Sequence, residues 1–161
     1  LEPTVKELSR AWREAGAIFA IAGGPHEASA LEVAIKLNEG PRMRATAYST
    51  EQFLHGPQAQ LQAGDAIIAF ASAGAALERT RAVAQFGLDI GAPVAWVAPV
   101  DGPKDVTMLN VRDVGERLAP IVQAIPGQLL AAYLAAQRDV DCDSFRRDEP
   151  AFEAAYERYL L

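Results

Sequence analysis

The segment AIFAIAGGPHEASALEVAIKLNEGP, residues 17–41, decides the fold. Its first six residues form a short apolar run that is compatible with a buried β-strand. Gly23-Gly24-Pro25 marks a turn, and residues 27–39 then have the pattern of a helix that ends at Gly40-Pro41. A buried strand followed at once by a helix is the repeating unit of a parallel sheet.

The same alternation continues along the rest of the chain. Four further runs predict strands, at residues 42–48, 66–71, 93–98 and 106–111. Helical patterns lie at residues 3–15, 75–90, 115–137 and 149–160. We expect Pro120 and Pro126 to break the third of these into two or three pieces. The order of elements predicts an α/β fold, a doubly wound three-layer sandwich built on a five-stranded parallel sheet.

Length and composition fit one domain over residues 1–161, with 50% hydrophobic and 22% charged residues. The net charge of -6 repels phosphate backbones, which argues against a nucleic-acid partner. A single cysteine, Cys142, and two histidines far apart in sequence give no metal-ligand cluster. Gly23-Gly24-Pro25 is not a dinucleotide fingerprint, so we expect neither a metal nor another cofactor.

The sequence gives no signal for a membrane or for export. We expect no stretch to act as a transmembrane helix, and the N-terminal segment is charged and amphipathic rather than a secretory signal. A cytoplasmic protein without a membrane partner is therefore the expectation.

The helix at residues 27–39 carries one narrow charged stripe. At 100° per residue, Glu32, Lys36 and Glu39 share one face, and nearly all other positions are apolar. The pattern is typical of a largely buried helix with an ion pair. Two interpretations stay open: an exposed salt-bridge ladder, or a carboxylate held beside a cation as a general base. In the second case Glu39, at the helix end, is the better base.

Both histidines are candidates for function. His55 is followed by Gly56-Pro57, which fixes it on a tight turn, and His26 lies near the start of the helix at residues 27–39. Each of them is equally consistent with a structural role, on the surface or in the core.

The motif Glu32-x-x-x-Lys36-x-x-Glu39, followed by His55-Gly56-Pro57, resembles the sugar isomerase (SIS) domain family. The pattern is similar to the second of the two SIS domains in the isomerase half of the glucosamine-6-phosphate synthases. The run that begins at Leu118 and the later Asp141-Cys142-Asp143 extend the similarity, which covers residues 17–143.

The resemblance implies a flavodoxin-like SIS domain that binds a phosphosugar. Glu39 matches the glutamate that moves a proton between C1 and C2 of the open sugar, and Lys36 matches a lysine that lines the site. His55 matches the ring-opening histidine, which the family supplies across a subunit boundary, so a homodimer is implied. The substrate-binding candidates are Glu32 on the stripe and, on the loops after two strands, Gly23, Gly24 and Ser72.

The sequence also departs from the family. No lysine follows Lys104, whereas the synthases have one near the C-terminus that acts in the sugar site. The phosphate loops are poor in hydroxyl groups, since Ser72 is the only one in the second loop. We therefore expect no glutamine-dependent amination, and we interpret the chain as the C-terminal half of a two-SIS-domain protein.

The resulting hypothesis is a phosphosugar isomerase-type enzyme. Its reaction is aldose–ketose isomerisation, or deamination or deglycation of an amino-sugar or Amadori-sugar phosphate. The alternative from another class is a non-catalytic, regulatory SIS module that binds sugar phosphates. A purely structural dimerisation domain is the third possibility.

Overall fold

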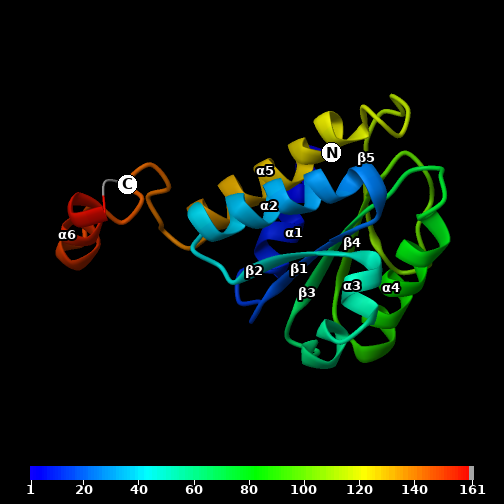
Figure 1. The fold of residues 1–161 in the computed structure, drawn as a ribbon, viewed down its shortest axis with the longest axis horizontal. Coiled ribbons are helices and arrows are strands. Elements are labelled where there is room, and N and C mark those ends of the chain that lie inside the picture. Colours follow the sequence, from blue (N-terminus) through cyan, green and yellow to red (C-terminus); the bar gives the residue numbers. More distant parts are fainter. Residues whose placement is uncertain (160–161) are drawn as a thin grey trace.

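Five short strands form one fully parallel sheet in the computed structural model, which describes residues 1–159 (Figure 1). The strands are β1 (Ile18–Ala22), β2 (Ala45–Ser49), β3 (Ala66–Phe70), β4 (Val94–Ala98) and β5 (Thr107–Asn110). Their order in space is β2-β1-β3-β4-β5, and every neighbouring pair is parallel. β1, β3 and β4 are buried along their whole length. The predicted sheet is confirmed, with each strand overlapping one of the predicted runs.

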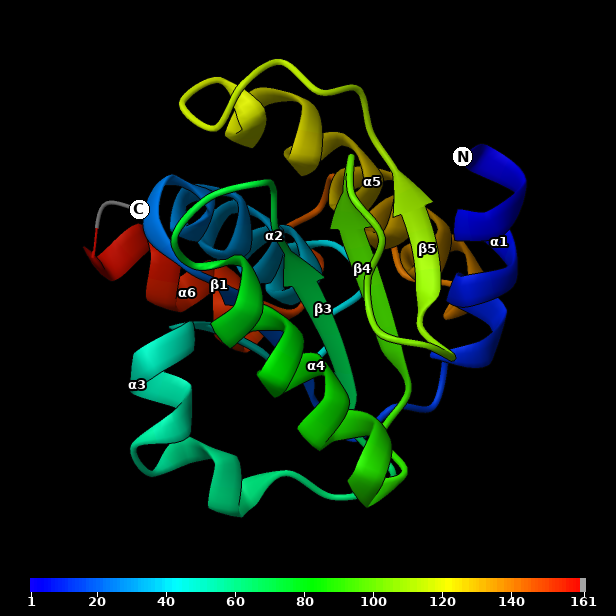
Figure 2. The ribbon, with the colours of Figure 1, turned by 90° about the vertical axis from the view of Figure 1, so that its right-hand side faces the viewer.

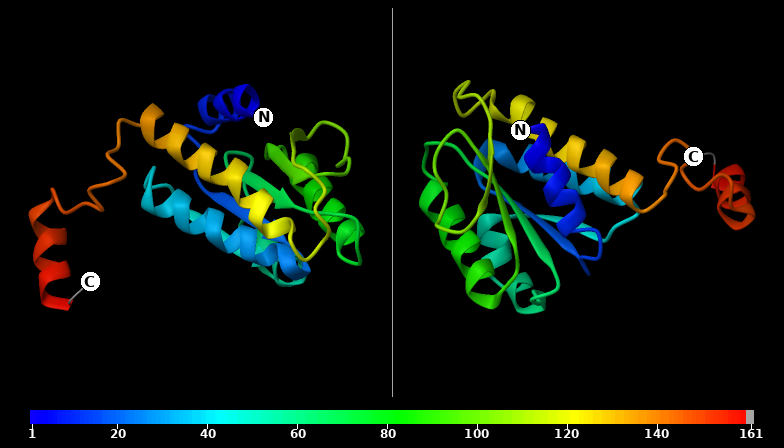
Figure 3. Two further views of the ribbon diagram at one scale, coloured as in Figure 1. Left: turned by 90° about the horizontal axis from the view of Figure 1, so that it is seen from above. Right: turned by 180° about the vertical axis from the view of Figure 1, so that it is seen from behind.

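Helices cover both faces of the sheet (Figure 2). One face carries α1 (Glu2–Ala11), α2 (Glu27–Glu39) and α5 (Ala119–Gln137), and the other carries α3 (Thr50–Leu54) and α4 (Leu77–Ile90). Two 3₁₀ turns, η1 (Gly24–His26) and η2 (Pro57–Gln60), precede α2 and follow α3. The last helix, α6 (Pro150–Tyr159), projects away from the sheet beyond the ends of α2 and α5 (Figure 3). Residue 160, the end of the helix predicted at 149–160, lies outside the described residues.

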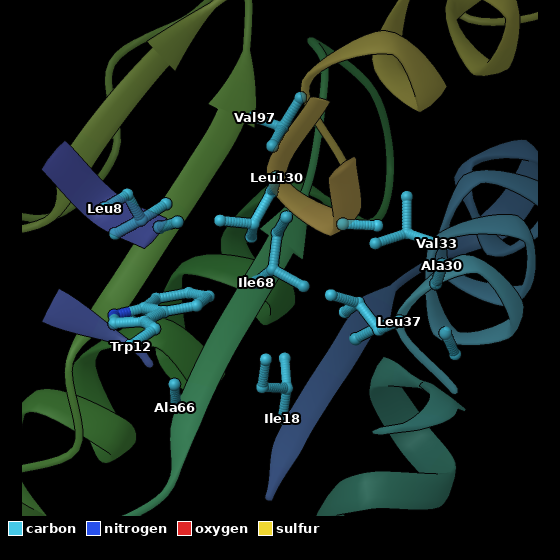
Figure 4. Close-up of a cluster of buried hydrophobic side chains, with 14 of the residues drawn as sticks. Leu8, Trp12, Ile18, Ala30, Val33, Leu37, Ala66, Ile68, Val97 and Leu130 are labelled. Carbon is cyan, nitrogen blue, oxygen red and sulfur yellow. The ribbon is translucent and has the colours of Figure 1, made fainter. Parts of the chain in front are cut away.

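The larger core lies between the sheet and the α1–α2–α5 layer. Figure 4 shows its side chains, which include Leu8 of α1 and Trp12 directly after it, Val33 and Leu37 of α2, Leu130 of α5, and Ile18 and Ile68 of the sheet. Full burial of an aliphatic side chain contributes about 1.5–3 kcal/mol relative to its exposure. This packing fixes α2 and α5 side by side on the sheet, where they frame the candidate site.

The predicted break in the 115–137 region is wrong. α5 runs without interruption from Ala119 to Gln137, with Pro120 in its first turn and Pro126 in its interior. A proline in the first turn forfeits no helical hydrogen bond, but one in the interior costs about 3 kcal/mol. The flanking residues Gln123 and Leu130 are fully buried, and their packing offsets that cost.

Gly127 lets α5 approach α2 closely. A Cβ atom at this position would overlap the side chain of Val33 on α2. The contact requires glycine despite its low helix propensity. The Pro126-Gly127 pair is therefore part of a tight helix crossing rather than a helix end.

Within the described residues, α5 is the one helix long and apolar enough to cross a membrane. From the sequence, no helix of this length and apolarity was expected. Eight of its residues are buried, and it packs on α1, α2 and β4. A core helix of an α/β domain has the same length and composition.

Candidate functional site

The two ends of α2 lie at opposite edges of the sheet. The helix begins after the carboxyl end of β1 and ends beside the start of β2, where the Asn38 Nδ2 group donates to the Ala45 carbonyl (2.8 Å). The Ala45 N–H in turn donates to Asn38 Oδ1 (3.2 Å). The 13 residues of α2 rise about 18 Å. The predicted site residues therefore fall into two groups, which one chain does not bring together.

Glu39 lies in the wall of a cavity of about 420 Å³ at the amino edge. We call this cavity the Glu39 pocket; it is formed by the end of α2, the α2–β2 loop and the C-terminal arm, residues 140–159. Its lining residues are Asn38, Glu39, Arg42, Met43, Arg44, Phe145, Arg146, Phe152 and Tyr156. An adjoining hollow of about 270 Å³ has Lys36, Glu39 and Gln128 among its lining residues. The carboxylate of Glu39 thus borders two neighbouring cavities.

Lys36 and Glu39 form the predicted ion pair. The Lys36 ammonium donates to Glu39 Oε2 at 3.0 Å, and both side chains are partly exposed. The hydrogen bond to Glu39 raises the pKa of the Lys36 amine above its ordinary value, so this amine is a cation at neutral pH. A fixed cation next to a carboxylate is an arrangement that can stabilise a developing oxyanion.

The remainder of the α2 stripe differs from the expectation. Glu32 accepts a hydrogen bond from Gln128 Nε2 of α5 at 2.9 Å and so bridges the two helices. Leu31 is 57% exposed and Ile35 47% exposed, so the prediction of a largely buried α2 is wrong on this face. Periodicity identified these positions as apolar, but apolarity alone does not establish burial.

Three arginines surround the Glu39 pocket. Arg42 Nη1 donates to Glu149 Oε1 of the arm at 3.0 Å, and Arg146 donates to both oxygens of Glu149 at 2.8 and 2.6 Å. The Arg146 guanidinium also lies over the Phe152 ring, 3.6 Å from its centroid. Arg44 is exposed at the same pocket. This group was not predicted, because Arg146 is remote in sequence from Arg42 and Arg44.

His55 lies apart from Glu39 within one chain. It caps the C-terminus of α3, its side chain is 77% exposed, and its ring approaches Glu51 Oε2 at 3.6 Å. β2 separates α3 from the end of α2, a distance of about 16 Å along the strand. His55 is not among the described residues that line the Glu39 pocket.

A second cavity, of about 470 Å³, lies at the carboxyl edge of the sheet. We call it the carboxyl-edge crevice; it is lined by Gly23, Gly24, Glu27, Ser49, Thr50, Glu51, Ala75, Ala76, Arg79 and Glu116. In open α/β folds this edge is the usual place for a ligand. The loop glycines predicted to bind substrate therefore do line a cavity.

The charge of the carboxyl-edge crevice does not suit a phosphate. Arg79 donates to both oxygens of Glu51 at 2.7 and 3.1 Å, which lowers the pKa of that carboxyl and engages the guanidinium. The Glu116 carboxylate lies against the loop after β3, since a Cβ built on Gly74 would fall 2.7 Å from Glu116 Oε1. Glu27 adds a third carboxylate to the lining. An anion in this crevice would be repelled.

Ser72 is buried in a hydrogen-bonded chain beside this crevice. Gln123 Nε2 donates to the carbonyls of Ala71 (2.8 Å) and Val97 (3.4 Å), so its Oε1 must face His26 Nδ1 at 2.8 Å. With its proton on Nδ1, the imidazole accepts at Nε2 a hydrogen bond from the Ser72 hydroxyl, 2.9 Å away. His26 and Gln123 are almost completely buried. The Ser72 proton is therefore engaged inside the protein.

Comparisons with known proteins agree with this architecture. The family model "SIS domain" matches residues 12–103. The glutamine–fructose-6-phosphate aminotransferase (isomerizing) of Gloeobacter violaceus is 35% identical over 149 residues, which cover 90% of this chain and 24% of that protein. The enzyme of the same name from Thermosynechococcus vestitus is 32% identical over the same shares of the two chains. The chain thus spans about a quarter of the length of the curated relatives it matches.

Solved structures share the fold. The C-terminal domain of glucosamine-fructose-6-phosphate aminotransferase from Francisella tularensis superposes with a TM-score of 0.78 at 24% identity, over 88% of this chain and 41% of that one. The sugar isomerase domain of an RpiR transcription factor from Sphaerobacter thermophilus gives a TM-score of 0.71 at 20% identity, over 91% and 84%. One domain architecture therefore occurs in an enzyme and in a regulator.

Proposed function

Because the chain belongs to the SIS domain family, we propose that it provides the catalytic carboxylate of a phosphosugar isomerase-type enzyme. The observation that carries this proposal is the Lys36–Glu39 pair, whose carboxylate borders a cavity large enough for a small molecule. The curated relatives that match the chain are isomerizing aminotransferases of fructose 6-phosphate, so a sugar phosphate is the substrate class.

In the proposed reaction, Glu39 acts as a general base. Its carboxylate removes a proton from the carbon next to the carbonyl of the open-chain sugar, and the electron pair shifts to form an enediolate. Glu39 returns the proton to the neighbouring carbon, and the Lys36 ammonium stabilises the negative oxygen in between. Isomerisation also moves the hydroxyl proton of one carbon to the oxyanion on the other, so that one carbonyl replaces the other, whereas deamination or deglycation adds the loss of an amine.

A second copy of the chain would provide His55. This histidine is exposed and remote from Glu39 in one chain, so ring opening requires it to come from a partner molecule. Exposed leucine and isoleucine side chains on α2 and α5 offer an apolar contact face; they are Leu31, Ile35, Ile121 and Ile125. α2 ends at the cavities beside Glu39, and Gln128, Ala131 and Ala132 of α5 line one of them, so a copy docked on this face would adjoin the site.

Turnover of the purified chain tests the enzyme role. Candidate substrates are fructose 6-phosphate, glucosamine 6-phosphate and an Amadori-sugar 6-phosphate, with separate detection of the isomerised sugar, ammonia and free amine. Glu39→Gln keeps the side-chain shape but removes the base, and should reduce turnover by about 10²–10⁴-fold. Glu7→Gln on the exposed surface of α1 is the matched control and should leave turnover unchanged. Equal turnover in both variants would remove Glu39 from the mechanism.

The oligomeric state tests the proposed partner. Ile35→Asp would place a charge in the apolar face and should convert a dimer into a monomer in light scattering. Mixing Glu39→Gln with His55→Ala chains should then restore activity, because mixed dimers contain one intact site. A monomeric wild-type chain with full turnover would contradict the shared site.

The alternative function is a regulatory module that binds sugar phosphates without converting them. The separation of His55 from Glu39 in one chain favours it, since binding requires neither a base nor ring opening. In that case the sugar phosphates would raise the melting temperature of wild type and Glu39→Gln alike, without product formation.

A further inference from the structure

The two cavities at the ends of α2 differ in the ion pairs that their arginines form. At the carboxyl-edge crevice, one arginine, Arg79, is among the lining residues, and it donates to both oxygens of Glu51. The Glu116 carboxylate lies against the loop at Gly74. At the Glu39 pocket, Arg42 and Arg146 both bond to Glu149, and Arg42 also approaches Asp148 Oδ1 at 3.9 Å. These two guanidinium groups therefore face two carboxylates of the C-terminal arm.

Arg44 adds a third guanidinium to the same pocket. It is exposed, it lines the cavity, and within residues 1–159 it takes part in no ion pair. Guanidinium groups bind phosphate and carboxylate through paired N–H donors, more strongly than neutral donors do. The volume of about 420 Å³ lies within the range of small-molecule sites.

Glu149 is an internal anion that binds two of these arginines. Its two oxygens accept hydrogen bonds from Arg42 and Arg146, and the bond from Arg146 lowers the pKa of the Glu149 carboxyl, which is thus ionised at neutral pH. The arm that carries Glu149 also contacts Arg42 through Ser144, at 3.4 Å. An incoming anion would compete with this internal carboxylate for the same two arginines.

We propose that Arg42, Arg44 and Arg146 hold the anionic group of the ligand in the Glu39 pocket, and that Glu149 is the internal anion which the ligand displaces. The ligand class is a sugar that bears a phosphate or a carboxylate. This inference rests on the proposed function in assigning the sugar to the Glu39 pocket. It places the anion site at the amino edge of the sheet and not on the glycine loops at the carboxyl edge.

Calorimetric titration with inorganic phosphate, glucose 6-phosphate, gluconate and glucose tests the site. Phosphate and glucose 6-phosphate should bind, glucose should not, and the result with gluconate decides whether a carboxylate is accepted in place of phosphate. Arg44→Gln should weaken the binding of glucose 6-phosphate by about 10- to 100-fold, because it removes charged hydrogen-bond donors to the anion. Arg10→Gln, an exposed arginine on α1, is the matched control and should change nothing.

Removing the charge of Glu149 is a second test, in which the affinity for the ligand should rise rather than fall. Glu149→Gln should tighten the binding of glucose 6-phosphate several-fold, because Arg42 and Arg146 lose their competing carboxylate. Glu116→Gln neutralises a carboxylate of the other cavity and should leave the affinity unchanged. Tightening by Glu116→Gln but not by Glu149→Gln would move the anion to the carboxyl-edge crevice and overturn the inference.

Binding and turnover separate this inference from the proposed function. Glu39→Gln should retain the affinity for glucose 6-phosphate whether or not the chain is an enzyme. Arginine-dependent binding without turnover would refute the enzyme and leave the anion site intact. Turnover that depends on Glu39 but has the same KM in Arg44→Gln and Arg10→Gln would refute the anion site and leave the enzyme intact.

Discussion

The carboxyl-edge crevice and the Glu39 pocket lie at opposite ends of α2 and differ in chemistry. The crevice is at the edge where open α/β sheets usually bind ligands, yet three carboxylates line it, and the Ser72 hydroxyl beside it is engaged with a buried imidazole. The pocket is at the other edge and combines a Lys36–Glu39 pair with three arginines and aromatic side chains. One fold thus provides several cavities, and the residues lining each cavity determine its ligand.

Replacing a cation in each region gives the largest expected contrast. Lys36→Met should lower turnover about 100-fold, because removal of one group that stabilises an oxyanion has an effect of that size. Arg79→Met in the crevice should leave turnover within twofold, since that guanidinium is bound to Glu51. Steady-state kinetics on the same substrate measures both variants. A loss of turnover in Arg79→Met as large as that in Lys36→Met would contradict the difference between the two cavities.

Two glutamines of α5 test whether Ser72 and its neighbours have a structural role. Gln123→Ala would leave His26 Nδ1 and the Ala71 carbonyl without partners, at about 1–3 kcal/mol for each buried group, so the free energy of unfolding should fall by about 2–6 kcal/mol. Gln128→Ala, which loses an exposed bond to Glu32, should cost under about 0.5 kcal/mol. Urea denaturation measures both, and equal costs would contradict a buried network.

A smaller effect on stability is expected at the crossing of α2 and α5, the helices that frame the candidate site. Gly127→Ala would force Cβ into the Val33 side chain and should destabilise the fold by about 1–2 kcal/mol, although alanine favours a helix. Gly64→Ala, where a Cβ meets open space, is the control and should be nearly neutral. A stabilising Gly127→Ala would show that the helices are not in contact there.

The smallest expected effect is the loosening of the C-terminal arm at acid pH. The folded pKa of Glu149 is depressed by Arg146, so the bond contributes fully above the ordinary pKa of 4.5 and is lost as pH falls through the folded value. Amide hydrogen exchange of residues 144–152, corrected for intrinsic rates, should therefore rise between pH 6 and pH 3. In Glu149→Gln this pH dependence should vanish; if it persists, another group anchors the arm.

Much of the fold could be predicted from the sequence because its signals are local. Four runs of six residues and one alternating run of seven, at residues 42–48, located all five strands, and the i, i+3 spacing located the Lys36–Glu39 pair. The short helix α3 was missed although Ser49 and Gln52 form a capping box, which is a readable signal. The continuity of α5 through Pro126 was not readable, since it depends on burial against α1 and α2.

The composition of the site was less predictable because it depends on tertiary contacts. Arg42 and Glu149 meet across 107 positions of sequence, and His26 meets Gln123 across 97. No periodicity links such residues. Ser72 shows the same limit: a hydroxyl after a strand is a local signal that the sequence contains, whereas its hydrogen bond with His26 depends on the fold.

Hydrogen–deuterium exchange into the sugar is the most direct measurement of the role of Glu39. The wild-type chain, incubated in D₂O with fructose 6-phosphate, glucosamine 6-phosphate and an Amadori-sugar 6-phosphate, should introduce deuterium at C1 or C2 of the converted sugar, as detected by mass spectrometry. Glu39→Gln should bind the same sugar and introduce none. Equal deuterium incorporation by the two chains would show that another group moves the proton.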